Sequence, residues 1–168
     1  MNSGTEAIDL TKWIEEAHQF GNYQDGTAYL IEMHGFGTND SGVYEEGEVI
    51  QLAKSGRSLA KAKLAKTPRG VWLYGYDFSS ATWGSASPIS VWNRTGYSTR
   101  GAAIDACIPE AIRFFEGVAR ATDSCTSETS KSEARQMIAA LSPKEPSPQM
   151  GLFDLLAIPP TTAPFEEP

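Results

Sequence analysis

The stretch GVWLYGYDFS, residues 70–79, decides the fold class of this chain. Its large side chains recur at every second residue, at Trp72, Tyr74, Tyr76 and Phe78. Because successive side chains of a β-strand point to opposite faces, this period predicts a strand with one aromatic face. We interpret the aromatic row as core, because a sheet must bury one face. The alternative is a stacking platform for a single-stranded nucleic acid.

Two other segments show strand-like patterns. PISVWN (88–93) is expected to pair with 70–79 as the second strand of a hairpin, after the linker SATWGSAS. TAYLIEMH (27–34) also alternates, with Tyr29, Ile31 and Met33 on one side. These segments predict a small antiparallel sheet.

Helical patterns flank the predicted sheet. Apolar residues recur at helical spacing over 10–20 and again over 99–121, where Ser98 is the expected cap. Ser130 and Glu133 match a capping box before a short last helix, ARQMIAAL. The segment 47–70 is ambiguous, although its Ala, Lys and Leu content favours a helix. We therefore expect an α+β fold, a small antiparallel sheet packed on one face by helices.

Length and proline content divide the chain into a domain and a tail. The 168 residues are enough for one globular domain with a respectable core. Seven of the ten prolines fall in the last 27 residues. We expect a globular domain over 1–141 and a disordered, proline-rich tail over 142–168.

The composition argues against several classes of protein. No apolar run approaches the ~20 residues of a membrane helix, and MNSGTEAIDL lacks the basic and apolar regions of a signal peptide. We expect a cytoplasmic protein whose Cys107 and Cys125 are reduced thiols, Cys107 on a buried helix face. His18 and His34 come from different predicted elements, so we expect no catalytic cluster, metal or cofactor, although the paired carboxylates Glu45 and Glu46 leave catalysis open.

The formal net charge of −7 is unevenly distributed. Residues 1–50 hold ten acidic residues and one basic residue, whereas residues 51–100 hold eight basic residues and one acidic residue. Charge blocks of this kind bear on partners and not on fold. The acidic block leaves open an inhibitor of a host or competing defence enzyme that mimics DNA, with a contiguous negative surface around residues 6–48.

The basic block contains a run that has no acidic residue between Gln51 and Tyr76. Lysine and arginine side chains bind the phosphates of nucleic acids without reading sequence. The run is therefore a candidate nucleic-acid contact, and a solvated face that balances the acidic block is the alternative. Its members are Lys54, Arg57, Lys61, Lys63, Lys66 and Arg69.

The tail carries one compact apolar cluster, which begins at QMGLF (149–153). This pentapeptide resembles the short motif by which bacterial polymerases and repair proteins dock on the β sliding clamp. Gln149, Leu152 and Phe153 match the motif outright, whereas Met150 and Gly151 depart mildly from it. The resemblance implies that Gln149 hydrogen-bonds to the pocket rim and that Leu152 and Phe153 enter a hydrophobic cleft.

Residues beyond the pentapeptide bear on this interpretation. Leu155 and Leu156 stand where the archaeal and eukaryotic clamp motif needs two aromatic residues, so the bacterial motif fits better. Leu155 is expected to extend the contact. The alternative is that 150–158 folds back onto the core of the domain itself.

A second resemblance covers about a quarter of the chain, from GVWLYGYDFS through CIPEAI. This segment resembles small accessory proteins found near partition and methylase genes of bacterial plasmids and conjugative elements, and it implies a mobile-element setting. Together the observations predict a non-enzymatic accessory protein of DNA replication, repair or a mobile element. It would dock on the bacterial sliding clamp and either recruit its domain or compete with polymerases. A nucleic-acid-binding module is the alternative.

Overall fold

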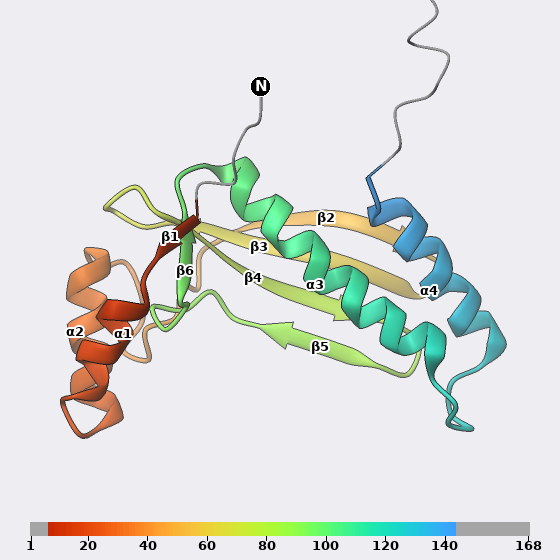
Figure 1. Cartoon of the computed structure of the whole chain (residues 1–168), viewed down its shortest axis with the longest axis horizontal. Coiled ribbons are helices and arrows are strands. Elements are labelled where there is room, and N and C mark those ends of the chain that lie inside the picture. Colours follow the sequence, from red (N-terminus) through yellow and green to blue (C-terminus); the bar gives the residue numbers. More distant parts are fainter. Residues whose placement is uncertain (1–6, 144–168) are drawn as a thin grey trace, which may run out of the picture.

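A computed structural model of the chain describes residues 7–143. These residues form an antiparallel sheet with four helices, so the predicted α+β class is confirmed (Figure 1). The motif at 149–153 lies outside the described residues.

Strand β4 lies at the centre of the sheet. The strand order is β1-β6-β4-β3-β2, and β5 also pairs with β4. Because β3 pairs along one whole edge of β4, strands β5 and β6 share the other edge. The strands are β1 (Ala7–Asp9), β2 (Glu48–Ser55), β3 (Ser58–Lys66), β4 (Trp72–Ser79), β5 (Gly84–Ser87) and β6 (Thr95–Tyr97).

The helices form two pairs. Helices α3 (Arg100–Arg120) and α4 (Glu128–Leu141) lie side by side across one face of the sheet (Figure 1). Helices α1 (Thr11–His18) and α2 (Tyr23–His34) form the second pair, at the end of the sheet where β1 and β6 lie.

The main core lies between the sheet and the pair α3–α4. Ala60, Ala62 and Phe78 of the sheet are buried there against Phe115 and Met137. Tyr74 and Tyr76 pack against this core and Trp72 packs against its extension beside Tyr97. The aromatic row of β4 therefore faces the helices, which confirms its interpretation as core.

A second core lies on the opposite face, at one end of the sheet. Ala65 and Leu73 point there and pack with Ile14 of α1 and Leu30 of α2. Ile89, in the segment between β5 and β6, is buried in the same cluster. The pair α1–α2 thus covers only the end of this face, together with the connecting loops.

The strand predicted at 27–34 is wrong, because these residues belong to α2. Asn22 caps the helix by accepting a hydrogen bond from the backbone N–H of Asp25 at 2.9 Å. The buried residues Thr27, Leu30 and His34 recur at helical spacing. The alternation of Tyr29, Ile31 and Met33 is not the buried face of a strand, because all three side chains are only partly buried.

The helix favoured for 47–70 is also wrong, because β2 and β3 form a hairpin there. Ala60, Ala62 and Leu64 alternate with Lys61 and Lys63, which places the apolar residues on the buried face. Burial of this row outweighs the helix propensity of alanine and lysine. Gly56 makes the turn with a positive φ of 55°.

The partner strand predicted at 88–93 is misplaced. The strand that pairs with β4 after the hairpin turn is β5, residues Gly84–Ser87. The chain then crosses beneath Gly75, where an added Cβ would meet the backbone of Ser87 and Pro88. Within 88–93, an isolated bridge joins Ser90 to Val43, and these residues form no strand.

Both predicted helix caps are wrong in position. Thr99, not Ser98, caps α3 by accepting from the backbone N–H of Ala102 at 3.1 Å. Ser127 caps α4 by accepting from the N–H of Ser130 at 3.1 Å. Glu133 does not close a capping box, because its carboxylate accepts a hydrogen bond from the backbone N–H of Arg57 in the β2–β3 turn at 3.2 Å.

We expect Gly56→Ala to lower the free energy of unfolding by about 1–2 kcal/mol, as measured by urea denaturation. The new Cβ strains a residue at positive φ and overlaps the Glu133 carboxylate, which must leave the turn. Gly101→Ala is the matched control, because nothing lies near Gly101 and it stands in a helix. Equal stability of Gly56→Ala and the wild type would contradict this account.

Candidate functional site

Three of the six residues of the basic run lie together on the face of the sheet opposite to α3 and α4. Lys61 and Lys63 alternate with the buried residues of β3, and Lys54 lies opposite Leu59 on the same side. We call this surface the lysine face, with Val49 and Gln51 of β2 and Asp77 of β4 as its neighbours. Val49 is 57% exposed, and none of the three lysines forms an ion pair within residues 7–143.

The other three basic residues point elsewhere. Arg57 lies in the β2–β3 turn, and Lys66 Nζ stands 6.0 Å from the centre of the Trp72 ring. Arg69 lies in the β3–β4 turn and donates to the backbone oxygen of Glu32 in α2 at 3.4 Å. The basic run is therefore not one surface, because the strand period and two turns separate its members.

The aromatic row and the lysine face lie on opposite faces of the sheet. A platform that stacks bases beside a positive groove needs both kinds of side chain on one surface. Lys54, Lys61 and Lys63 therefore do not form such a groove beside the aromatic strand 72–78. The lysine face alone retains the capacity to contact phosphates.

A groove lies between α3 and β5, lined by residues of both elements. Strand β5 extends the sheet beyond the helix pair (Figure 1). The groove consists of two adjoining cavities, of about 320 and 210 Å³, that share Tyr76 and Glu110. We call it the α3 groove. Its larger cavity lies where the edge of β4 changes partner from β6 to β5, and Asn93 Nδ2 donates there to the backbone oxygen of Tyr74 at 2.8 Å.

One end of the α3 groove is polar and the other is aromatic. Tyr97, which is 6% exposed, lines the polar end with Arg94 and Glu110. Burial raises the pKa of the Tyr74 and Tyr97 hydroxyls, so both are neutral near pH 7. At the other end, the rings of Tyr76 and Phe78 stack at 4.4 Å, and Phe114 continues the aromatic floor.

The sequence analysis did not identify the α3 groove. Tyr97 belongs to a strand of three residues, and Glu110 lies on α3 at a position that no motif marks. The spacing of Glu110, Arg113 and Phe114 places these residues on one side of the helix, but only the position of β5 makes that side a groove.

Acidic residues gather on the α1–α2 end of the molecule and on the loop that follows it. Glu15, Asp25 and Glu32 are exposed on the two helices, and Glu45 and Glu46 are exposed on the loop. These acidic residues lie on other elements than the lysine face, which lies on β2 and β3.

The two histidines do not form a catalytic or metal site. His34 is 1% exposed, its Nε2 lies 3.2 Å from the backbone oxygen of Val91, and the edge of Trp13 packs against its ring. His18 is exposed beside Trp92. Within residues 7–143, no group of three or more His, Cys, Asp or Glu side chains is placed to hold a metal ion.

Cys107 and Cys125 are free thiols, as the sequence predicts. Cys107 is fully buried on α3, and burial raises the pKa of its thiol to about 12, so it is not a reactive nucleophile near pH 7. Cys125 is exposed in the loop between α3 and α4.

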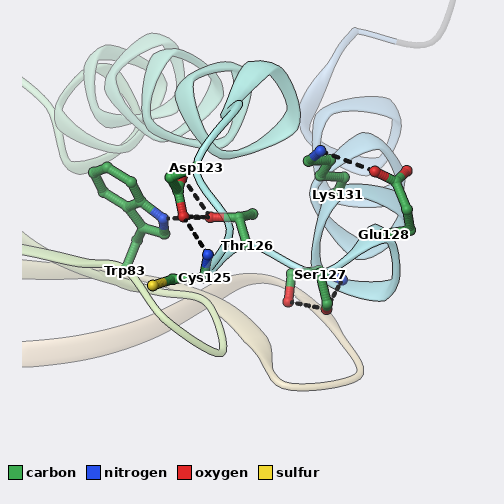
Figure 2. Close-up of polar contacts among 8 residues, drawn as sticks. Trp83, Asp123, Cys125, Thr126, Ser127, Glu128 and Lys131 are labelled. Carbon is green, nitrogen blue, oxygen red and sulfur yellow. Dashed lines mark hydrogen bonds and ion pairs between the residues drawn. The ribbon is translucent and has the colours of Figure 1, made fainter.

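The α3–α4 loop is fastened to the β4–β5 turn by Trp83 (Figure 2). Trp83 Nε1 donates to Thr126 Oγ1 at 2.9 Å, and Thr126 in turn donates to the Asp123 carboxylate at 3.0 Å. Asp123 also accepts from the backbone N–H of Cys125. This chain of hydrogen bonds explains the half-exposed indole as a structural contact, and it fixes β5 relative to the end of α3.

Comparison of the chain with protein-family models, with curated proteins and with solved structures finds no match. Among the described residues, no helix is both long and apolar enough to cross a membrane.

We expect the stability of this protein to fall as the pH drops below about 6.5, the pKa of histidine in an unfolded chain. Burial lowers the pKa of His34 in the folded state, so between the two pKa values the unfolded chain binds one more proton. The free energy of unfolding then decreases by up to about 1.4 kcal/mol per pH unit.

Urea unfolding between pH 7.5 and pH 5.5 measures this dependence in a range where carboxylates are mostly ionised. His34→Gln removes the buried imidazole and should flatten the slope, and His18→Gln, at an exposed histidine, is the matched control. Equal slopes in the wild type and His34→Gln would show that the buried imidazole is not the cause.

Proposed function

We propose that this protein is a non-enzymatic accessory protein of DNA replication or repair, or of a mobile element, that docks on the bacterial β sliding clamp. The observation that carries the proposal is QMGLF at 149–153, only six residues after Pro143, the last described residue. Gln149, Leu152 and Phe153 serve as anchors, with Met150 and Leu155 in support. The globular domain is either recruited to DNA or excludes polymerases from the clamp.

The energetics of such docking favour a weak and reversible contact. Burial of the Met150, Leu152 and Phe153 side chains contributes ~1.5–3 kcal/mol each. Ordering a segment costs ~2–5 kcal/mol, and the loss of rigid-body freedom costs more. The gains and costs are of similar size, so we expect weak binding, with a dissociation constant in the micromolar range or above, which suits a protein that exchanges with others on a shared hub.

The full chain should bind a purified bacterial sliding clamp, and the double substitution Leu152→Ala/Phe153→Ala should weaken binding by at least about a hundredfold. Both side chains lose their burial in the cleft. Isothermal titration calorimetry measures the affinity.

Thr161→Ala/Thr162→Ala, in the same tail, is the matched control and should bind as the wild type does. Equal binding by the wild type and the Leu152→Ala/Phe153→Ala variant, or no binding to clamps from several bacterial groups, would refute the proposal.

Contact of the lysine face with a nucleic-acid backbone is a second candidate function. The observation that favours it is the placement of Lys54, Lys61 and Lys63 on one side of the sheet, with no ion pair to a residue of the described domain. Three phosphate contacts without base reading make binding weak and dependent on salt. Such a contact would hold the domain on DNA beside a clamp.

Lys61→Glu/Lys63→Glu should abolish binding of single-stranded DNA, which fluorescence anisotropy measures over a range of salt concentrations. The wild type should show a slope of log K against log salt of about −2, from three phosphates on a single strand. Lys12→Glu is the control, because Lys12 is exposed on α1 and is not part of the lysine face. A salt-independent affinity, or equal effects of the two charge reversals, would exclude the lysine face.

A further inference from the structure

We propose that the α3 groove is the intramolecular binding site of residues 150–158, and that this contact masks the clamp motif until a clamp competes for it. This inference rests on the proposed function for its regulatory meaning but not for the contact itself. The occupant is a segment of this chain, MGLFDLLAI, that lies outside the described residues.

The aromatic end of the groove suits apolar side chains, and its polar end suits the backbone and the single charge of the segment. The aromatic end, between β5 and α3, is lined by the partly exposed rings of Tyr76 and Phe114, and the buried ring of Phe78 packs against both. The two adjoining cavities, of about 320 and 210 Å³, together reach the size range of ligand sites in proteins. Apolar side chains of a docked segment gain burial there, at about 25 cal/mol per Å² of apolar surface.

The segment is rich in the side chains that such a groove accepts. Six of its nine residues are large and apolar, and only Asp154 is charged. The large apolar residues are Met150, Leu152, Phe153, Leu155, Leu156 and Ile158. A soluble chain that holds so much apolar surface in one short segment gains free energy by covering it.

The length of chain after the fold is sufficient for the segment to reach the groove. Helix α4 ends at Leu141, which is buried against the core beneath α3 and α4. The groove lies on the other side of α3, and packed helices are 8–10 Å apart, so the path across α3 is about 20 Å. Met150 follows Pro143 by seven residues, an extended reach of about 23 Å, and the rest of the segment continues beyond it.

The charges on the groove rim complement the single charge of the segment. Arg94 lines the larger cavity, and it forms no ion pair within residues 7–143. Arg113 lines the smaller cavity and pairs with Glu110 at 3.0 Å. Asp154 lies in the middle of the segment, so the apolar residues on its two sides can enter the groove while its carboxylate meets an arginine at the rim.

A tethered segment needs only weak affinity to stay docked. A short tether gives an effective concentration of about 1 mM, so an intrinsic dissociation constant of about 0.1 mM keeps about nine chains in ten docked. The motif is then accessible to a clamp in about one chain in ten. The apparent affinity of the full chain for the clamp is therefore about tenfold lower than the affinity of the free motif. Clamp binding and groove binding become mutually exclusive, because both bury Leu152 and Phe153.

Hydrogen exchange of the full chain, read by mass spectrometry, tests the contact without a clamp. Ser85 stands opposite Phe78 on the groove side of β5, so Ser85→Trp fills the groove without removing a core side chain. Ala86 is its neighbour on the other face of the same strand, so Ala86→Trp is the matched control. We expect residues 150–158 to exchange about tenfold faster in Ser85→Trp than in the wild type and in Ala86→Trp.

A second variant covers the case in which Ser85→Trp disturbs the fold. Arg113 is exposed, and Arg113→Glu reverses the charge at the groove rim, which should also accelerate exchange of 150–158. Exchange of β3 and β4 amides in the same data shows whether each variant is folded. Exchange of 150–158 at the rate of an unprotected chain in the wild type, or equal exchange in the wild type and a folded variant, overturns the proposal.

Clamp binding by the same variants separates this inference from the proposed function. If both hold, Ser85→Trp binds the clamp about tenfold more tightly than the wild type and Ala86→Trp do. Protection of 150–158 without any clamp binding keeps the intramolecular contact and refutes the proposed function. Clamp binding that is equal in all variants, without protection, refutes the contact and keeps the proposed function.

Discussion

Ala60 and Ala62 of β3 are fully buried beneath α3 and α4, and their small side chains let the helix pair lie close to the sheet. On the neighbouring strand, Phe78 fills the space beside them against Phe115. Because the side-chain period of a strand is two, burial of this row sends Lys61 and Lys63 to the opposite face. This alternation places Lys61 and Lys63 on the lysine face, away from the main core.

The same packing creates the α3 groove. Two helices cover β2, β3 and β4, but the sheet continues to β5, so the far side of α3 lies beside aromatic rings that are only partly covered, such as Tyr76 and Phe114. Trp83 and Thr126 fasten the β4–β5 turn to the end of α3, which holds β5 in place beside the helix. A groove bounded by a fastened strand and a long helix is largely preformed, and this lowers the entropic cost of binding a segment there.

Most of the acidic block lies on other elements of the molecule than the lysine face. Acidic side chains lie on α1, α2 and the following loop, and the three unpaired lysines lie on the sheet. A negative molecule with one local positive face approaches DNA weakly by itself, because the field of the whole protein opposes the approach. Delivery by a clamp would remove this disadvantage by holding the lysine face near the duplex, so the two proposed contacts reinforce each other.

Several patterns along the chain were read correctly, although the alternation at 27–34 and both helix caps were not, and pairings between distant segments were not predicted. The two-residue period of Trp72 to Phe78 and the helical stripe of α3 each follow from local geometry, so both elements and the α+β class were predictable. The hairpin at 48–66 was not, because Ala and Lys favour a helix unless a helix layer buries one row of them. Glu133 fits a capping box by spacing, yet it caps a turn that is distant in sequence, because α4 places it above Gly56.

The sequence by itself determined the aromatic strand, the long helix, the reduced thiols and the apolar motif that follows the fold, since each depends on a residue type or a period along the chain. Only the tertiary structure decided which lysines share a surface and that a groove lies beside α3. Strand pairing and helix packing bring together residues such as Tyr76, Ser85 and Phe114. The physical reason is that a binding surface is formed by residues from several elements. The free energy that holds these elements together comes from contacts between segments distant in sequence.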